Sequence, residues 1–193
     1  MKLGTRSPKL ILASASPRRA ELLRNAGIAF TAQATRIPER RRQGESPKKL
    51  AERLARQKAR AIRATNPRRL VLGADTIVIV RGKVLGKPRD RSDARRMLRL
   101  LSGRSHQVTT AVCLAGPGFE DLRSETTRVT MRRLSEQEIR DYVASREPRD
   151  KAGAYAIQGI ASRFVSRIEG CYFNLVGLPV PLVYRMLRAH HCL

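Results

Sequence analysis

This sequence has few of the residues on which several kinds of binding site and scaffold depend. Tryptophan is absent and aromatic residues make up only 4% of the 193 residues, which argues against an aromatic-lined carbohydrate site or a base-stacking platform. The three cysteines, Cys113, Cys171 and Cys192, are scattered without a CxxC pair, so we expect neither a disulfide framework nor a structural zinc site. No apolar run approaches the roughly 18–20 residues of a membrane span, and Leu10–Ala15 is too short for a signal-peptide core. We therefore expect a reduced, cytoplasmic protein.

Acidic residues are scarce beside basic ones. The 16 Asp and Glu residues face 40 Lys and Arg residues, which gives a formal net charge of +24, most of it within residues 1–96. Such a field attracts polyanions of any kind, including nucleotides, nucleic acid and anionic membrane surfaces. Arginine greatly outnumbers lysine, however, and a GC-rich coding bias produces the same skew without selection for binding. Both interpretations stay open, so the charge alone does not define a function.

Apolar runs and helical patterns alternate along the chain, with no internal repeat and no long linker. The apolar fraction of 41% is enough for a sizeable core. The patterns predict strands at 10–13, 70–80, 84–85, 106–115, 124–134 and 164–168. Helices are expected at 17–26, 47–64, 92–101, 136–145 and 180–189, with a loop at 151–159. Strands linked partly by helices and partly by hairpins indicate an α/β fold with a mixed sheet, in a single domain over 1–193.

Three charged residues break the patterns around them. Asp75 is the only charge in the apolar run 70–80, where a carboxylate loses its hydration unless a cation or metal partners it. Such carboxylates are more often functional than structural, although a buried Arg or Lys partner is the structural alternative. Lys58 shares a helix face with apolar residues, so its ammonium either reaches water past them or faces a cleft. Lys87 follows Gly86 in a turn where backbone can approach a ligand closely.

The segment Ser14–Arg19 places hydroxyls and two arginines where a strand gives way to a helix N-terminus. Free N–H groups and the positive end of the helix dipole bind phosphate at such positions. The chain has no GxxxxGK[ST] and no GxGxxG after a strand, which disfavours a P-loop NTPase and a Rossmann dehydrogenase. The three histidines form no metal-binding pattern and no Ser-His-Asp arrangement.

Together these segments resemble the Maf family of nucleoside triphosphate pyrophosphatases. The resemblance covers about residues 8–188 and rests on LILASASPRR (10–19), QKA (57–59), GADT (73–76), LGKP (85–88), LSG (101–103), KAGAYAIQG (151–159) and NLVGLP (174–179). It implies a fold like that of inosine triphosphate pyrophosphatases, an elongated mixed β-sheet flanked by helices with two lobes around a cleft. It also implies a cytoplasmic enzyme, commonly a homodimer, that uses Mg²⁺ or Mn²⁺ to cut a nucleoside triphosphate into monophosphate and pyrophosphate.

The resemblance also implies roles for individual residues. Asp75 matches the proton acceptor, Lys58 and Lys87 match lysines that neutralise triphosphate charge, and Ser14, Arg18 and Arg19 match the phosphate-contacting motif. Glu39 lies where the family has an acidic cluster and is expected to hold the metal with Asp75. This chain departs from its relatives there, because 36–39 keeps one carboxylate and three arginines follow it.

Substrate choice in the family is linked to positions that are here Arg18, Thr76 and Gln158. This trio resembles the branch that acts on dTTP and UTP rather than the branch that prefers 7-methyl-GTP. A Gln amide suits a pyrimidine because it both donates and accepts hydrogen bonds. The alternative to a pyrophosphatase is a catalytically inactive nucleic-acid-binding or cell-division regulatory protein on the same fold, which the basic N-terminal half suggests through non-specific nucleic acid contact.

Overall fold

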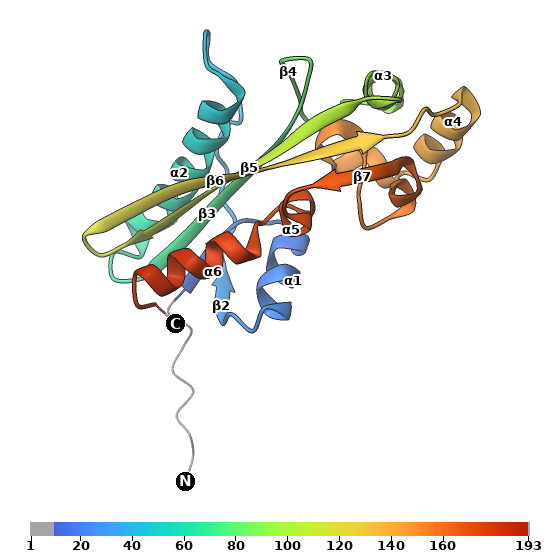
Figure 1. Ribbon diagram of the computed structural model, residues 1–193. Coiled ribbons are helices and arrows are strands. Elements are labelled where there is room, and N and C mark those ends of the chain that lie inside the picture. Colours follow the sequence, from blue (N-terminus) through green and yellow to red (C-terminus); the bar gives the residue numbers. More distant parts are fainter. Residues whose placement is uncertain (1–9, 193) are drawn as a thin grey trace.

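The computed structural model describes residues 10–192 (Figure 1). The two ends of the expected domain 1–193, and the start of the family resemblance at residue 8, lie outside the described residues. The strands are β1 Leu10–Ala13, β2 Phe30–Ala32, β3 Leu70–Val80, β4 Lys83–Leu85, β5 Ser105–Gly116, β6 Phe119–Met131 and β7 Val165–Glu169. The α-helices are α1 Pro17–Asn25, α2 Pro47–Thr65, α3 Arg91–Leu101, α4 Glu136–Ala144, α5 Tyr172–Val176 and α6 Val180–Ala189, and short 3-10 helices are η1 Glu147–Asp150, η2 Ala152–Ala154 and η3 Ile160–Phe164.

These strands form one mixed sheet in the order β2-β1-β3-β5-β6-β7, with β4 also paired to β3. β1 is parallel to both β2 and β3. The pairs β3–β5, β5–β6 and β6–β7 are antiparallel. Helix α2 covers one face of the sheet, and α1 and α6 cover the other, above and below the strands in Figure 1. The expected α/β architecture, a mixed sheet with helices on both sides, is confirmed.

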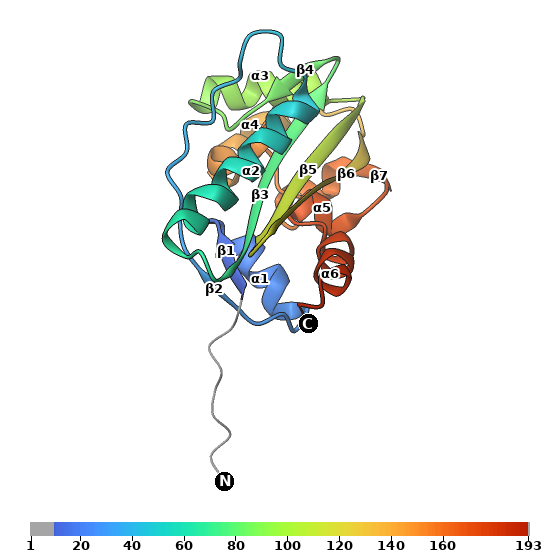
Figure 2. The same cartoon turned by 90° about the vertical axis from the view of Figure 1, so that its left-hand side faces the viewer.

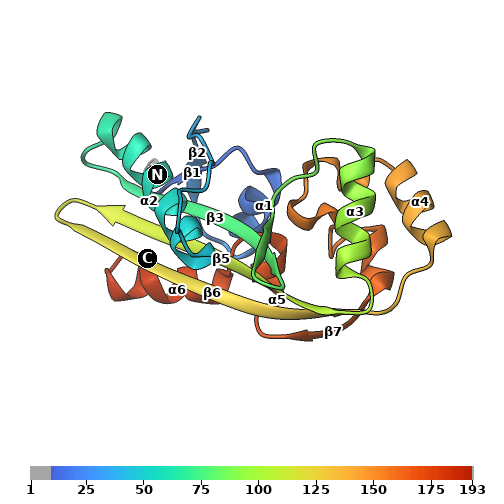
Figure 3. The ribbon, with the colours of Figure 1, turned by 90° about the horizontal axis from the view of Figure 1, so that it is seen from above.

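The core consists of three apolar clusters, two on opposite faces at one end of the elongated sheet and one at the other end. One apolar cluster joins α2 to β1, β3 and β5, and a second fills the opposite face beneath α1, α5 and α6. A third cluster lies at the far end, where α3 and α4 pack with β4, the 3-10 segments and the ends of β5 and β6. Figure 3 shows α3 and α4 at one end of the sheet and α2 and α6 toward the other.

The edge of β3 opens between these two ends. β5 pairs with one edge of β3 throughout 71–79. On the other edge, β1 pairs with β3 only as far as Ala13 opposite Gly73, and β4 pairs with it only from Val78 onward. Within the described chain, the β3 stretch 74–77 therefore has no strand beside it on this edge. A crevice beyond the carboxyl end of a strand such as β1 is where open α/β sheets bind ligands.

The predicted helices and strands are confirmed in type and order, with differences in some bounds and in the short elements. The strand expected at 124–134 runs instead over Phe119–Met131, because the β5–β6 hairpin pairs as far as its Gly116–Phe119 turn. Four short elements, β2, α5, η1 and η3, were not predicted, and the loop expected at 151–159 contains η2. Ser16 occupies the N-cap of α1 but its side chain makes no capping hydrogen bond. Among residues 10–192, no helix is both long enough and apolar enough to cross a membrane.

Candidate functional site

A cleft of about 410 Å³ lies at the open stretch of β3, between the two ends of the sheet. It collects residues from the β1–α1 junction, the loop before α2, the β4–α3 turn and the segment around η2. All of the predicted site residues line it: Ser14, Arg18, Arg19, Glu39, Lys58, Asp75, Thr76, Lys87 and Gln158. Residues from opposite ends of the sequence thus meet where the sheet leaves an edge exposed.

The floor of the cleft is a chain of three charges. Lys58 Nζ donates to Asp75 Oδ1 at 2.7 Å and to Glu39 Oε1 at 2.6 Å. The side chains of Lys58 and Asp75 are only 10% and 8% exposed, whereas that of Glu39 is 54% exposed. Of the two interpretations of Lys58, the cleft-facing one is correct, because its ammonium bridges two carboxylates rather than standing in bulk water.

A glycine brings Lys58 to Asp75. Side chains alternate along a strand, so Gly73 and Asp75 face the same side, toward α2. A Cβ at Gly73 would lie 2.2 Å from the carbonyl oxygen of Ala55 and 2.7 Å from the amide nitrogen of Ala59. Only glycine allows α2 to approach β3 this closely, and that approach places Lys58, on the inner face of α2, within hydrogen-bonding distance of Asp75.

Burial raises and the neighbouring cations lower the pKa of both carboxyls, but burial prevails at Asp75 and the cations prevail at Glu39. Burial raises the pKa of Asp75, and the nearby charges of Lys58 and Arg19 offset this only in part. For Glu39 burial also acts upward, but the hydrogen bond and charge of Lys58, with the charges of Lys87 and Arg19, together lower its pKa. A buried carboxyl with a raised pKa beside a more exposed, ionised one is typical of catalytic sites.

Arg19 and Thr76 form the other side of the open β3 edge. The Arg19 guanidinium donates to the carbonyl oxygens of Ala74 and Gly177, to Ser14 Oγ and to Thr76 Oγ1, at 2.8–3.2 Å. Four of its five N–H groups are thereby used within the protein. Arg19 consequently ties β1, β3 and the segment after α5 together, with one N–H left for a ligand.

The walls of the cleft hold the more exposed polar side chains. Arg18 lies in the first turn of α1, and Lys87 is exposed on the turn after β4. That turn is held to η2 by a hydrogen bond from the amide of Gly153 to the carbonyl of Gly86 at 3.0 Å. Gln158 is exposed beyond η2, and its amide makes no hydrogen bond to another described residue. Lys87 and Gln158 are therefore available to a ligand with their whole polar ends, whereas Arg19 has a single N–H left for one.

Sequence reasoning missed three titratable residues of the cleft wall: Asp150, Lys151 and Tyr155. Lys151 and Tyr155 belong to the KAGAYAIQG segment, which was quoted for the family resemblance without a role for either of them. Tyr155 is buried, and its hydroxyl hydrogen bonds to His106 Nε2 at 2.8 Å. Nothing in the local pattern marks Asp150, because an acidic residue in a short 3-10 turn is usually solvated.

The donor set of the cleft fits a divalent cation of the Mg²⁺ or Mn²⁺ type. No group of three or more His, Cys, Asp or Glu side chains gathers anywhere in residues 10–192, which disfavours an all-protein metal cage. Mg²⁺ is instead commonly bound by one or two carboxylates together with substrate phosphates and water. Glu39 and Asp75 supply such a pair, and Asp75 Oδ2 accepts no hydrogen bond from another residue of the described chain.

Comparison with known proteins identifies the family and the fold of the chain. A "dTTP/UTP pyrophosphatase" of Koribacter versatilis is 58% identical over 179 residues, covering 93% of both chains. One of Salmonella typhimurium is 52% identical over 185 residues, which is 95% of this chain and 94% of the relative. The Ham1 protein of Staphylococcus aureus has the same fold, with a TM-score of 0.55 at 12% identity over 94% of this chain and 98% of its own. The profile of the Maf-like protein family matches residues 9–190, and the chain belongs to the Maf family.

Proposed function

We propose that this protein hydrolyses dTTP and UTP to the nucleoside monophosphate and pyrophosphate. The observation that carries the proposal is the Glu39–Lys58–Asp75 chain on the floor of a cleft whose walls bear Arg18 and Lys87. A buried base next to several cations suits hydrolysis of a polyanionic substrate. The curated relatives named dTTP/UTP pyrophosphatase support the same activity.

In the proposed reaction Asp75 accepts a proton from water as the water oxygen attacks the α-phosphorus. A bond forms between this oxygen and the α-phosphorus while the bond to the bridging oxygen breaks, and pyrophosphate leaves with the electron pair. Lys58 holds the Asp75 carboxylate in place through Oδ1. Lys87 and Arg18 stabilise the charge that grows on the leaving pyrophosphate.

Glu39 and Asp75 would hold the divalent metal. When bound there, Mg²⁺ or Mn²⁺ supplies charge neutralisation to the phosphate oxygens. The protein's own contribution is to keep Glu39 ionised toward the cleft, because its lowered pKa provides a charged ligand at neutral pH.

The substrate's base is proposed to lie near Gln158 and Thr76, with Arg18 at the phosphates. The Gln158 amide carries both a donor and an acceptor, which matches the polar edge of thymine or uracil. Thr76 Oγ1 is already held by Arg19 at 3.1 Å and by Thr110 Oγ1 at 2.9 Å. Its position is consequently rigid, as a specificity-determining residue requires.

The test is pyrophosphate release from a panel of nucleoside triphosphates with Mg²⁺ or Mn²⁺. The proposal expects dTTP and UTP to be the fastest substrates. Faster turnover of 7-methyl-GTP would reject the assignment to the dTTP/UTP branch. Failure to hydrolyse any triphosphate would reject the activity and favour an inactive, regulatory member of the family.

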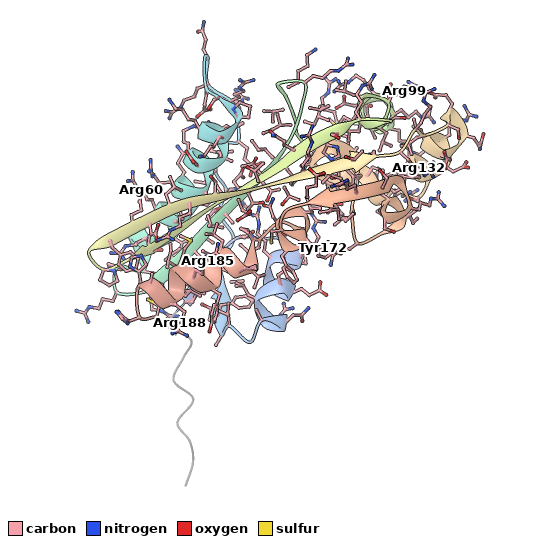
Figure 4. The ribbon with its side chains drawn as sticks, viewed as in Figure 1. Arg60, Arg99, Arg132, Tyr172, Arg185 and Arg188 are labelled. Atoms are coloured by element: carbon pink, nitrogen blue, oxygen red, sulfur yellow. The ribbon has the colours of Figure 1, made fainter. Side chains whose placement is uncertain are left out.

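The large positive charge carries a weaker proposal, non-specific contact with nucleic acid. Arg40, Arg41 and Arg42 are exposed on the loop before α2, but other arginines project from several elements (Figure 4). Three of these, Arg60, Arg99 and Arg132, already pair with glutamates. Binding to duplex DNA that weakens steeply with salt would support this contact, and no binding at low salt would exclude it. The homodimer and the cytoplasmic location stay predictions.

A further inference from the structure

One carboxylate bridges the two walls of the cleft at a place that no proposed role explains. Asp150 ends η1, and its Oδ1 accepts a hydrogen bond from Lys151 Nζ. Its Oδ2 lies 3.6 Å from Arg18 Nη1, on the first turn of α1. The single carboxylate thus spans a cation from the β1–α1 side and a cation from the η1–η2 side. All three residues line the cleft.

The burial of these three groups is uneven. The Lys151 side chain is 16% exposed, whereas that of Asp150 is 66% exposed. A lysine this buried is usually paired, and here its partner is the more exposed group of the two. Burial acts to raise the pKa of Asp150, but the hydrogen bond and charge of Lys151 and the charge of Arg18 together lower it. Asp150 is therefore a charged, solvent-accessible anion held between two cations that face the cleft.

A carboxylate held by two cations has the same binding chemistry as a phosphate group. Both present two or more anionic oxygens to N–H donors, and Arg and Lys recognise both of them. A triphosphate brings several negative charges to the same donors, whereas Asp150 brings one. Because exposed ion pairs contribute little stability, the Arg18–Asp150 contact is weak enough for a triphosphate to displace.

We propose that Lys151 is a further phosphate-binding residue of this cleft and that Asp150 is its resident counter-ion, which the triphosphate or pyrophosphate displaces. The inference rests on the proposed function for the identity of the ligand. Lys151 then acts with Arg18 from the opposite wall, so that phosphate binding joins the two ends of the sheet. Asp150 keeps these cations paired until the ligand arrives.

The two residues have opposite predicted effects on binding. Lys151→Gln removes a charged donor, which should weaken pyrophosphate binding and raise KM for dTTP about tenfold or more. Asp150→Asn removes the competing anion and should strengthen pyrophosphate binding and lower KM about two- to fivefold. The matched control is Arg149→Gln, which changes the net charge at a neighbouring exposed residue outside the cleft. Its effect on both quantities should be less than about twofold.

The experiment measures the Kd for pyrophosphate by calorimetry, KM and kcat for dTTP, and the melting temperature of each variant. Opposite changes for the two variants, with the control unchanged, support the proposal. An unchanged or weakened pyrophosphate affinity in Asp150→Asn would overturn it, and so would an unchanged affinity in a folded Lys151→Gln variant. If Lys151→Gln does not fold, Asp150→Asn decides alone. If the wild-type protein releases no pyrophosphate from any triphosphate, the proposed function fails, whereas the calorimetry still tests the inference itself.

Discussion

Replacement of Asp75 by Asn tests the proposed base with the smallest structural change. The amide keeps the size of the side chain, and its oxygen still accepts a hydrogen bond from Lys58, which also keeps Glu39 as a partner. The variant lacks only the negative charge and the capacity to take a proton. We expect turnover of dTTP to fall about 10²–10⁴-fold, the usual contribution of a general base. KM should change much less, because Arg18 and Lys87 remain.

The stability of this variant follows from the raised pKa of Asp75. Burial outweighs the attraction of Lys58 and Arg19, so folding makes the charged form of this side chain less favourable than it is in the unfolded chain. A neutral amide should therefore change the free energy of unfolding by no more than about 1 kcal/mol, which for a protein of this size is a melting shift within about 4 °C. Because folding raises the pKa of Asp75, the free energy of unfolding of the wild type should fall as pH rises from the ordinary carboxyl pKa through the raised one. Asp75→Asn should not show this fall.

Asp93→Asn is the matched control, since Asp93 is buried near the start of α3 and does not line the cleft. Hydrogen bonds from Arg96 and the backbone of Arg89 lower the pKa of Asp93. Its stabilising effect is present above the ordinary carboxyl pKa and is lost as pH falls through the lowered value. Asp93→Asn should therefore melt earlier at neutral pH and keep its turnover per folded molecule. Near-normal turnover in Asp75→Asn, measured by pyrophosphate release beside this control, would remove Asp75 as the base.

Three other results are expected. Gly73→Ala should destabilise the protein by about 1–3 kcal/mol and lower its activity, because the added Cβ meets the backbone of α2. The control is Gly86→Ala, whose added Cβ meets nothing within 4 Å and should leave the melting temperature unchanged. Equal melting temperatures for the two variants would contradict the close packing of α2 on β3. Glu45→Gln should loosen the loop that carries Glu39 and reduce kcat/KM, since Arg53 donates hydrogen bonds to the Glu45 carboxylate at 2.6 and 2.8 Å. These hydrogen bonds lower the pKa of Glu45 to about 2. The difference in melting temperature between variant and wild type should therefore shrink as pH falls from about 4.5 toward 2. Chelation of divalent metal should abolish turnover and Mg²⁺ should restore it, with Glu39→Gln requiring more Mg²⁺; full activity in the presence of chelator would refute the metal site.

Much of the fold follows from local patterns in the sequence. The β3 run Leu70–Val80 was predicted with its observed bounds because eleven consecutive residues suit a strand buried on both faces. The start of α2 was equally clear, since Ser46 caps the helix and Pro47 occupies its first turn. By contrast, β2 has three residues and α5 has five, too few for a periodic pattern. Elements of this length depend on tertiary packing rather than on local sequence.

The sequence indicated which residues line the candidate site, but not which of them contact one another. Helical spacing placed Lys58 on the inner face of α2, and the isolated charge marked Asp75. No local pattern shows that one ammonium joins Asp75 to Glu39, which lies in an irregular loop. The contact of Arg18 with Asp150 also escaped prediction, because it joins residues more than 130 positions apart. β1 and β4 lie toward opposite ends of β3 (Figure 2), and the open stretch between them is a property of the sheet that no local pattern shows.

The most direct test of the proposed chemistry is to follow the oxygen of the attacking water. The protein is incubated with dTTP and Mg²⁺ in water enriched in oxygen-18, and the products are separated and weighed by mass spectrometry. Attack at the α-phosphorus predicts one labelled oxygen in the thymidine monophosphate and none in the pyrophosphate. Label in the pyrophosphate, or release of orthophosphate in its place, would contradict this account of the cleft.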